Sequence, residues 1–343
     1  MRLLEVNDLN VTFPTSDGVV NAVRGVSFGI DPGRTLGIVG ESGSGKSVAA
    51  MTLLGLSRGA TVTGQALFDG DDLLSMSEPD LRAVRGARIA MVFQDPLSSL
   101  HPLYPIGWQI TEAIQAHTRT SRRAAREIAV DLLAMVGIPQ PRRRIGDYPH
   151  QFSGGMRQRV MIAIALALKP DIVIADEPTT ALDTTVQAQI LDLLQRLRND
   201  LGMALVIITH DLGIIAQTAD EVLVMYAGRV AETAERRDLF YRSHHPYTLG
   251  LLASVPAAAG TGRLQPIPGQ PPSPIRLPAG CPFAPRCAYR MGRCAGQEPP
   301  LIPVTGHAGH QSACWLPSDA VGTGTAARTA RDLAVRCSGP VAA

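Results

Sequence analysis

Short runs of apolar residues, separated by turn-forming and charged residues, recur along the first two thirds of the chain. Residues 35–39, 171–175 and 205–209 are each almost wholly apolar, as is typical of strands buried on both faces of a parallel sheet. Helical spacing of apolar positions follows two of these runs, at 48–56 and 184–197. Strands that alternate with helices in this way predict an α/β fold.

Two other regions depart from this alternation. Residues 1–34 hold short apolar runs broken by turn residues such as Asp17-Gly18, which predicts antiparallel strands. Residues 95–165 are mainly helical in pattern and include one amphipathic helix that ends at a glycine. The apolar positions of that helix and its final glycine are Ile128, Leu132, Val136 and Gly137.

The apolar run at 35–39 leads into a glycine-rich segment, GESGSGKS, at residues 40–47. The segment fits the pattern G-x-x-x-x-G-K-[ST], in which glycines turn the backbone so that consecutive N–H groups surround a phosphate. Lys46 is expected to reach the β- and γ-phosphates, and the Ser47 hydroxyl to complete a Mg²⁺ shell. The helix that follows would direct its N-terminus at the phosphates, where free N–H groups favour anions. The alternative is a Gly/Ser turn with an unrelated lysine.

Acidic residues and a histidine end two further apolar runs. Asp176 and Glu177 follow the run at 171–175, where an aspartate can hold Mg²⁺ through water and a glutamate can polarise an attacking water. His210 follows the run at 205–209, where a third strand of the same sheet would meet the γ-phosphate. A solvated turn for the acids and a structural role for the histidine are the alternatives.

Ser153, Gly154 and Gly155 open another helix, because the apolar residues after them follow helical spacing. This is a second helix N-terminus suited to an anion. One phosphate site needs only one such terminus, so the second is expected to serve the nucleotide of another molecule. An ordinary helix start is the alternative.

In this order and spacing, these segments resemble the ATP-binding subunit of ABC transporters. The resemblance covers roughly residues 1–235 and includes the stretches SGGMRQR, DIVIADEPT and Ala181-Leu182-Asp183. It implies an α/β P-loop NTPase core with an N-terminal antiparallel β subdomain and an inserted helical subdomain at about 95–165. One departure is that Phe152 and Met156 stand where the family's commonest signature, LSGGQ, has Leu and Gln.

The resemblance also implies roles for individual residues. Gln94 corresponds to a lid glutamine that touches Mg²⁺ and senses the membrane subunit, and Asp183 to a dimer-contact aspartate. Phe13 resembles the aromatic residue that stacks on adenine, although a place in the core is also open to it. The implied ligands of ATP and Mg²⁺ are Phe13, Gly40, Ser42, Gly43, Ser44, Gly45, Lys46, Ser47, Val48, Gln94, Asp176, Ser153, Gly154 and Gly155. The implied catalytic residues are Glu177 as the base, His210 as the switch histidine, and Lys46.

The composition changes after about residue 235. Residues 255–285 are rich in proline and glycine, which predicts extended, loop-rich structure. The segment HPYTL at 245–249 resembles the opening of the C-terminal extension found on importers of oligopeptides, dipeptides and nickel. We therefore expect an ATP-binding domain at 1–235, an extension at 236–317 and a disordered tail at 318–343.

Four cysteines of the extension have the spacing C-x5-C-x6-C-x19-C; they are Cys281, Cys287, Cys294 and Cys314. A reducing cytosol disfavours disulfides, which leaves a metal site or a coincidence. Four thiolates can ligate a [4Fe–4S] cluster, and some members of the peptide-importer subfamily have one on a similar pattern. Zinc, with His307 or His310 as a further ligand, is an alternative, although the usual C-x2-4-C pairs are absent. Cys337, in the predicted tail, is expected to be idle.

Charge and hydropathy exclude some classes of protein. The net charge of +2 gives no reason to expect a nucleic-acid partner. The longest apolar run, at 160–168, is far shorter than the ~20 residues that span a bilayer. Glu5 and Asp8 interrupt the first apolar stretch, unlike a signal peptide. We therefore expect a peripheral protein that is held at the cytoplasmic face of the membrane by its partners.

The resemblance implies an ATPase that drives the uptake of di- or oligopeptides. Nickel or another small solute is an alternative cargo, and a soluble ABC ATPase of DNA repair or translation is a third reading. The implied partners are a second ATP-binding subunit (identical or a paralogue) bound head to tail, two membrane permeases, and an extracytoplasmic solute-binding protein. Because the phosphate loop and the cysteines fall in separate predicted domains, we expect ATP binding to be independent of the cysteines.

Overall fold

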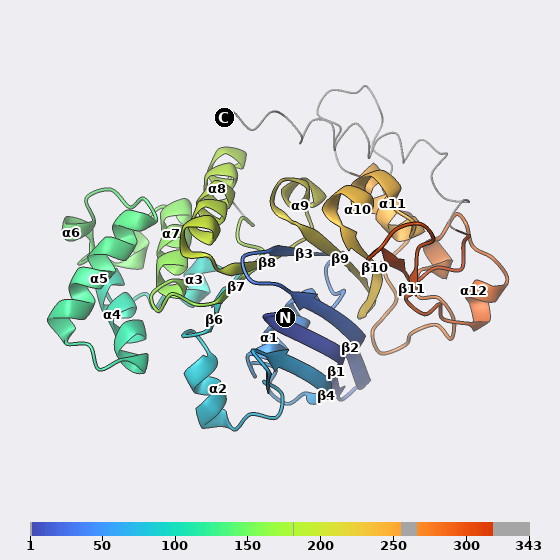
Figure 1. Cartoon of the computed structure of the whole chain (residues 1–343), viewed down its shortest axis with the longest axis horizontal. Coiled ribbons are helices and arrows are strands. Elements are labelled where there is room, and N and C mark those ends of the chain that lie inside the picture. The colour runs from blue at the N-terminus through green and yellow to red at the C-terminus, as the bar shows by residue number, and fades with distance from the viewer. Residues whose placement is uncertain (1, 181, 255–265, 318–343) are drawn as a thin grey trace. The chain divides into compact units, whose positions relative to one another are not determined.

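The computed structural model describes residues 2–180, 182–254 and 266–317 (Figure 1). The predicted tail at 318–343, with Cys337, and Ala181 of the ALD motif lie outside the described residues. The chain divides into two compact units, which we call unit 1 and unit 2. Unit 1 contains residues 31–34 and 75–208, and unit 2 contains residues 2–30, 35–74 and the described residues from 209 onward.

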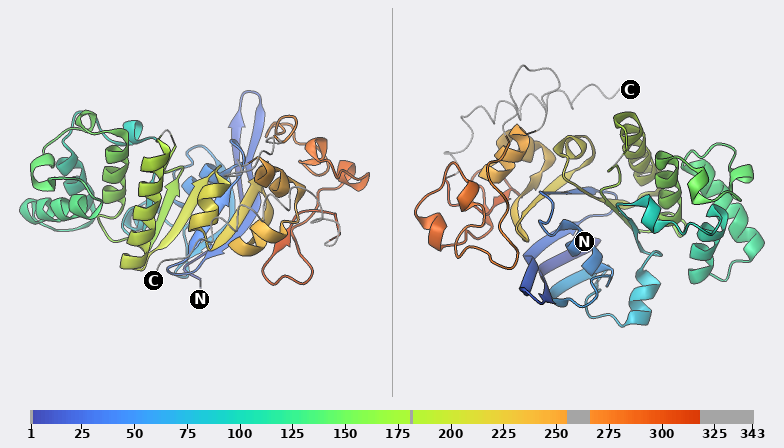
Figure 2. Two further views of the ribbon diagram at one scale, coloured as in Figure 1. Left: turned by 90° about the horizontal axis from the view of Figure 1, so that it is seen from above. Right: turned by 180° about the vertical axis from the view of Figure 1, so that it is seen from behind.

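The antiparallel strands predicted near the N-terminus are present in unit 2. Strands β1 (Leu4–Thr15) and β2 (Gly18–Ile30) form a long hairpin, seen from above in Figure 2. Strands β4 (Thr61–Phe68) and β5 (Asp71–Asp72), which the sequence did not reveal, extend this sheet in the order β2-β1-β4-β5. Leu4, Val6, Leu9 and Val11 of β1 are buried and form part of the core.

A second run of paired strands in unit 2 carries the phosphate loop. The five residues of β3 (Thr35–Val39) are all buried, and β3 pairs in parallel with β9 (Glu221–Tyr226). The sheet continues through β10 (Arg229–Glu235) and β12 (Gln311–Ser312) to β11 (Ile302–Pro303). The helices of unit 2 are α1 (Lys46–Leu53), α9 (Leu212–Thr218), α10 (Arg236–Arg242), α11 (Pro246–Ala253), the short 3-10 helix η2 (Ala284–Arg286) and α12 (Arg293–Gly296).

Unit 1 contains the other predicted parallel strands. Strand β7 (Ile172–Asp176) pairs in parallel with β6 (Ile89–Val92) on one side and with β8 (Ala204–Thr209) on the other. Its helices are α2 (Glu78–Val84), α3 (Pro96–Ser99), α4 (Ile106–His117), α5 (Arg122–Met135), α6 (Pro141–Arg144), the 3-10 helix η1 (Pro149–Gln151), α7 (Gly154–Ala165) and α8 (Thr184–Leu201). The mainly helical pattern predicted for residues 95–165 is therefore confirmed.

The predicted helix limits are close to those observed, but α1 ends at Leu53 rather than residue 56, and α8 extends to Leu201 rather than residue 197. Helix α1 begins at Lys46 rather than residue 48, because the left-handed Gly45 (φ 98°) supplies its N-cap. In α5, Leu132 and the C-cap residue Val136 are buried as expected, but Ile128 is 39% exposed. The predicted apolar face of this helix was therefore wrong at Ile128, because the residues that α5 buries are Ala125, Ala129, Val130, Leu132 and Leu133. Among the residues described in both units, no helix is long and apolar enough to cross a membrane.

Candidate functional site

The loop between β3 and α1 has the backbone form that the glycine pattern predicts. Gly40 has a φ of 157°, and a Cβ there would lie 2.2 Å from the Met225 carbonyl oxygen. A Cβ on Gly45, whose φ is 98°, would lie 2.3 Å from the Ala22 carbonyl oxygen. Neither position accommodates a side chain, so both glycines are required for the loop to pack against these neighbours.

Lys46 lies at the start of α1 and is 5% exposed. Its Nζ donates hydrogen bonds to the carbonyl oxygens of Gly40 at 2.8 Å and Glu41 at 3.0 Å. The ammonium group is thus held inside the loop by neutral acceptors. A phosphate would offer the ammonium charged acceptors, which form stronger hydrogen bonds than neutral carbonyls.

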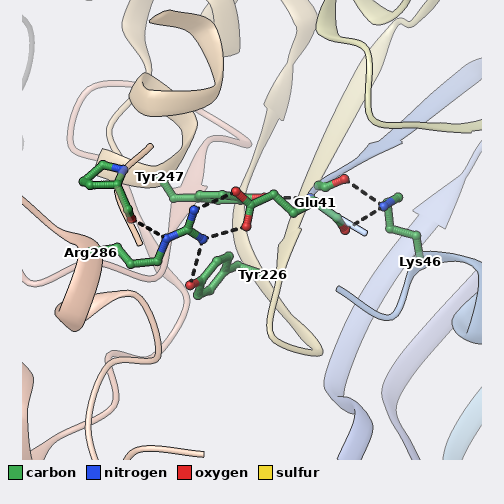
Figure 3. Close-up of polar contacts among 7 residues, drawn as sticks. Glu41, Lys46, Tyr226, Tyr247 and Arg286 are labelled. Atoms are coloured by element: carbon green, nitrogen blue, oxygen red, sulfur yellow. Dashed lines mark hydrogen bonds and ion pairs between the residues drawn. The ribbon is translucent and has the colours of Figure 1, made fainter. Parts of the chain in front are cut away.

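Glu41 connects the loop to the C-terminal extension (Figure 3). Arg286 donates from Nη1 to Oε2 of Glu41 at 2.6 Å and from Nη2 to Oε1 at 2.8 Å. The backbone N–H of Glu41 donates to the Tyr247 hydroxyl at 2.8 Å, and Arg286 also donates to the Tyr226 hydroxyl at 3.3 Å. The hydrogen bonds to Glu41 raise the pKa of Arg286, and burial raises the pKa of Tyr247.

No role was predicted from the sequence for Glu41, Tyr226 or Arg286, and Tyr247 was noted only as part of the HPYT segment. That segment does form a turn entering a helix, because His245 caps α11 by accepting the Tyr247 N–H. In the sequence, the signal for Arg286 was its position between Cys281 and Cys287, which were noted as candidate metal ligands. We expected ATP binding to be independent of the cysteines because the loop and the cysteines were assigned to separate domains, but the loop contacts Tyr247 and Arg286 of the extension directly.

The acidic residues at the end of β7 are held in a defined geometry in unit 1. Asp176 is 5% exposed, and Glu177 adopts a left-handed backbone conformation (φ 46°) that is unusual for a non-glycine residue. The Glu177 N–H donates to the Ile208 carbonyl oxygen at 2.8 Å. Its Oε2 accepts hydrogen bonds from Gln94 Nε2 at 3.1 Å and from Thr180 Oγ1 at 2.8 Å. Strained backbone that is fixed in this way is concentrated at functional sites.

The structure brings Gln94 and Glu177 together, while the Mg²⁺ role of Gln94 and the role of Glu177 as base remain predictions. His210 is exposed directly after β8 and belongs, with Lys46, to unit 2. Phe13 is half-buried in β1 opposite Val20, so part of its ring remains accessible. The adenine-stacking role of Phe13 and the switch role of His210 remain predictions.

Ser153 is the N-cap of α7, where its hydroxyl accepts the Met156 N–H at 3.4 Å. Ser153 and Gly154 are exposed, so the first N–H groups of the helix face solvent. A Cβ on Gly155 would lie 2.5 Å from Cγ1 of Val186, so this glycine allows α7 to pack closely against α8. The predicted helix start is therefore present and exposed, and its binding of an anion remains a prediction.

Arg144 contacts both residues that depart from the LSGGQ signature, Phe152 and Met156. Its guanidinium carbon lies 4.5 Å from the centre of the Phe152 ring, and its Nη1 lies 3.6 Å from Sδ of Met156. Asp147 anchors the same guanidinium by an ion pair at 3.1 Å. The two substituted residues therefore share one packing partner beneath the helix start.

Asp183, the predicted dimer-contact residue, is exposed and caps α8. Its Oδ1 accepts the Val186 N–H at 3.0 Å. Asp183 thus stabilises the helix start within its own chain. A dimer contact by Asp183 remains a prediction.

The four cysteines of the extension line one common cavity. Burial raises the pKa of the Cys281 and Cys287 thiols, and raises that of Cys314 to about 12. Within the described residues, however, no three Cys, His, Asp or Glu side chains are arranged to hold a metal ion. The structure therefore places the four thiols around one cavity, but it gives no other support to the predicted [4Fe–4S] cluster.

The structure also weakens the zinc alternative. Neither His307 nor His310 lines the cavity of the four thiols. His310 is buried elsewhere, with its Nε2 2.7 Å from Oε1 of Glu232. That carboxylate also accepts the backbone N–H groups of His244 and His245. His310 is thus part of a buried hydrogen-bond network of the extension.

Two family models match the chain, and the first of them covers both the phosphate loop and the acidic end of β7. Residues 23–180 match the ABC transporter family, and residues 231–294 match the oligopeptide/dipeptide transporter C-terminal region. Among solved structures, the dimeric ATP-binding cassette MJ0796 with ADP and phosphate superposes with a TM-score of 0.62 at 28% identity. It covers 68% of this chain, and the match includes 99% of that structure. The fold is that of an ABC ATPase cassette.

Individual relatives identify the family of ABC transporter proteins more closely. The chain is 50% identical to the oligopeptide transport ATP-binding protein OppD of Bacillus subtilis, over 92% of this chain and 89% of that protein. It is 50% identical to OppD of Salmonella typhimurium over 92% of this chain and 94% of that protein. The chain is 49% identical to the dipeptide transport ATP-binding protein DppD of Bacillus subtilis, over 92% of this chain and 95% of that protein. The chain belongs to this family of oligopeptide and dipeptide ABC transporter ATP-binding proteins.

Proposed function

We propose that this chain is the ATP-hydrolysing subunit of an ABC importer that takes up di- or oligopeptides. The observation that carries the proposal is a phosphate loop closed around Lys46 on the same chain as an oligopeptide/dipeptide transporter C-terminal region. The partners would be a second ATP-binding subunit, two permeases and an extracytoplasmic solute-binding protein. These partners would hold the chain at the cytoplasmic face of the membrane.

ATP would bind with its phosphates in the loop at 40–47 and its adenine against Phe13. The N–H groups of the loop and the Lys46 ammonium would stabilise negative charge on the phosphates. The Ser47 hydroxyl, Gln94 and the Asp176 carboxylate supply the oxygen ligands that Mg²⁺ prefers, and the ion would neutralise charge on the β- and γ-phosphates. Glu177, oriented by Gln94 and Thr180, would polarise the attacking water, with His210 near the γ-phosphate.

Reconstitution tests this function directly. The chain would be assembled with its permeases and partner subunit in vesicles that contain ATP, and uptake of labelled di- and tripeptides would be measured. Uptake that depends on ATP and on the chain supports the proposal. ATP-dependent uptake of nickel but not of peptides would select the alternative cargo. ATPase activity that no permease or solute alters would favour a soluble, non-transport ATPase.

The exposed start of α7 is proposed to serve the nucleotide of the partner subunit. Ser153→Arg should therefore reduce steady-state ATPase activity of the assembled complex on the order of 100-fold, because one helix terminus no longer stabilises the transferred phosphate. The isolated subunit should keep its ATP affinity, which calorimetry measures. Ser121→Arg, which changes the exposed N-cap serine of α5 in the same unit, is a control expected to change turnover much less. Loss of ATP affinity in the Ser153→Arg monomer would contradict the shared site.

We also propose, as a finer part of this function, that the four cysteines hold a [4Fe–4S] cluster. In its favour are four thiols around one cavity and the absence of His307 and His310 from that cavity. Burial and, to a smaller extent, the neighbouring thiols raise the pKa of Cys314, so a cation among them would relieve the cost of forming thiolates. A cluster here would cross-link the loops of the extension and contribute to their folding free energy.

Anaerobically purified protein should accordingly be brown, with absorption near ~400 nm and about four irons per chain. Replacing Cys281, Cys287, Cys294 or Cys314 by serine should lower the iron content several-fold and speed proteolysis of the extension. Cys337→Ser is the matched control and should change neither. Colourless protein with one zinc per chain would select zinc, and metal-free protein with a protease-resistant extension would contradict both.

A further inference from the structure

The extension and the phosphate loop are in contact at a residue that no part of the proposed function uses. Arg286 and Glu41 are separated by 245 positions in the sequence, yet they form a two-pronged ion pair. The Arg286 side chain is 5% exposed and that of Glu41 is 26% exposed. An ion pair this well shielded, with two parallel hydrogen bonds, fixes the relative orientation of both groups.

The contacts of Glu41 lead directly to the catalytic lysine. Figure 3 shows Arg286 and Lys46 approaching Glu41 from opposite sides. The Glu41 carboxylate is held by Arg286, its N–H by the Tyr247 hydroxyl, and its carbonyl oxygen accepts from Lys46 Nζ at 3.0 Å. The Glu41 carbonyl oxygen also accepts the Ser44 N–H at 3.2 Å, so every polar group of this loop residue is engaged, and two of its four partners come from beyond residue 245.

Arg286 in turn depends on the fold of the extension. It ends the short helix η2, whose first residue, Ala284, donates its N–H to the carbonyl oxygen of Cys281. The Nε of Arg286 donates to the Pro268 carbonyl oxygen at 2.9 Å, so Arg286 also contacts the proline-rich segment. That segment also lines a small cavity together with the loop, through Pro271, Pro272 and Pro274.

We infer that Arg286 is a positioning residue for nucleotide binding: through Glu41 it fixes the phosphate loop, so ATP affinity depends on the folded extension. The inference rests on the proposed function, because it assumes that the loop binds ATP. Arg286 touches no nucleotide in this scheme. Its effect passes through the backbone of Glu41 to the lysine that binds the phosphates.

The test is a double-mutant cycle on the full chain, with the Kd for ATP measured by calorimetry in the presence of Mg²⁺. Glu41→Gln and Arg286→Gln should each weaken ATP binding about tenfold, within the range of typical coupling between sites. The double variant should also lose about tenfold rather than a hundredfold, because the two residues act as one unit. Arg286→Lys, which keeps the charge but not the two-pronged geometry, should recover part of the affinity.

Arg293→Gln is the matched control. Arg293 lies in the same extension and stacks 3.5 Å from the centre of the Trp315 ring, but it is exposed and bonds Gln297 rather than the loop. A purely structural role for Arg286 would lower the thermal midpoint of its variant while leaving the Kd unchanged. If Arg286→Gln unfolds the extension, Glu41→Gln still tests the contact, because it breaks the same ion pair without changing any residue of the extension.

Two outcomes would overturn the inference alone: wild-type Kd values in both single variants, or additive losses in the double variant. A wild-type chain that binds no ATP would overturn the proposed function, and this inference with it. Equal weakening by Arg293→Gln would also overturn the inference, because it would show a general effect of the extension's stability rather than a specific contact.

Discussion

Glu177→Gln should lower ATP hydrolysis by the assembled complex roughly 10²- to 10⁴-fold, the range that a positioned general base contributes. The amide keeps the size of the side chain and its hydrogen bonds to Gln94 and Thr180 can be remade, but it cannot accept a proton from water. ATP and Mg²⁺ should still bind with near wild-type affinity. The measurement is steady-state phosphate release, with ATP binding followed in parallel.

Asp192→Asn is a suitable control for that substitution. Asp192 is also a carboxylate of unit 1, but it lies exposed on α8, where it pairs with Arg196. Surface pairs of this kind contribute little, so turnover should be unchanged. Near wild-type turnover in Glu177→Gln would remove this residue from the role of base, and its left-handed backbone would then need another explanation.

Lys46→Ala should have its main effect on binding rather than on turnover of bound nucleotide. A hydrogen bond to a charged group contributes about 1.5–3 kcal/mol, so ATP affinity should fall roughly 10- to 100-fold. Calorimetric titration of the isolated chain measures this loss. The chain's other lysine, Lys169, is exposed and offers the matched control, Lys169→Ala. Unchanged ATP affinity in Lys46→Ala would exclude the loop as the phosphate site.

Much of the fold could be predicted because its determinants are local. The apolar run at 35–39, the glycines after it and the helix at Lys46 follow one another directly, so steric limits on φ decide the loop within a few residues. The caps of α7 and α8 are likewise decided by Ser153 and Asp183 together with N–H groups three residues away. Patterns of this range can be read without knowing the tertiary structure.

Features that depend on distant segments were missed or misjudged. Nothing near Glu41 in the sequence indicates Arg286, because the pair forms only when the extension packs against the loop. Ile128 has the right helical spacing for the core, but the packing of α5 against its neighbours decides which apolar positions are covered. The cysteine spacing predicted that the thiols would gather, which they do, but not the ligand arrangement that a metal requires.

The short strands of the extension have a consequence for the solubility of the chain. Strand β12 pairs with β10 at Glu232 and Thr233, and β11 pairs with β12 in turn. Both added strands have only two residues, and Pro303 in β11 has no N–H to offer a further strand. The extension thus covers part of the open edge of β10. The new edge, β11, is too short to recruit a strand of another chain, and this protects against edge-to-edge aggregation.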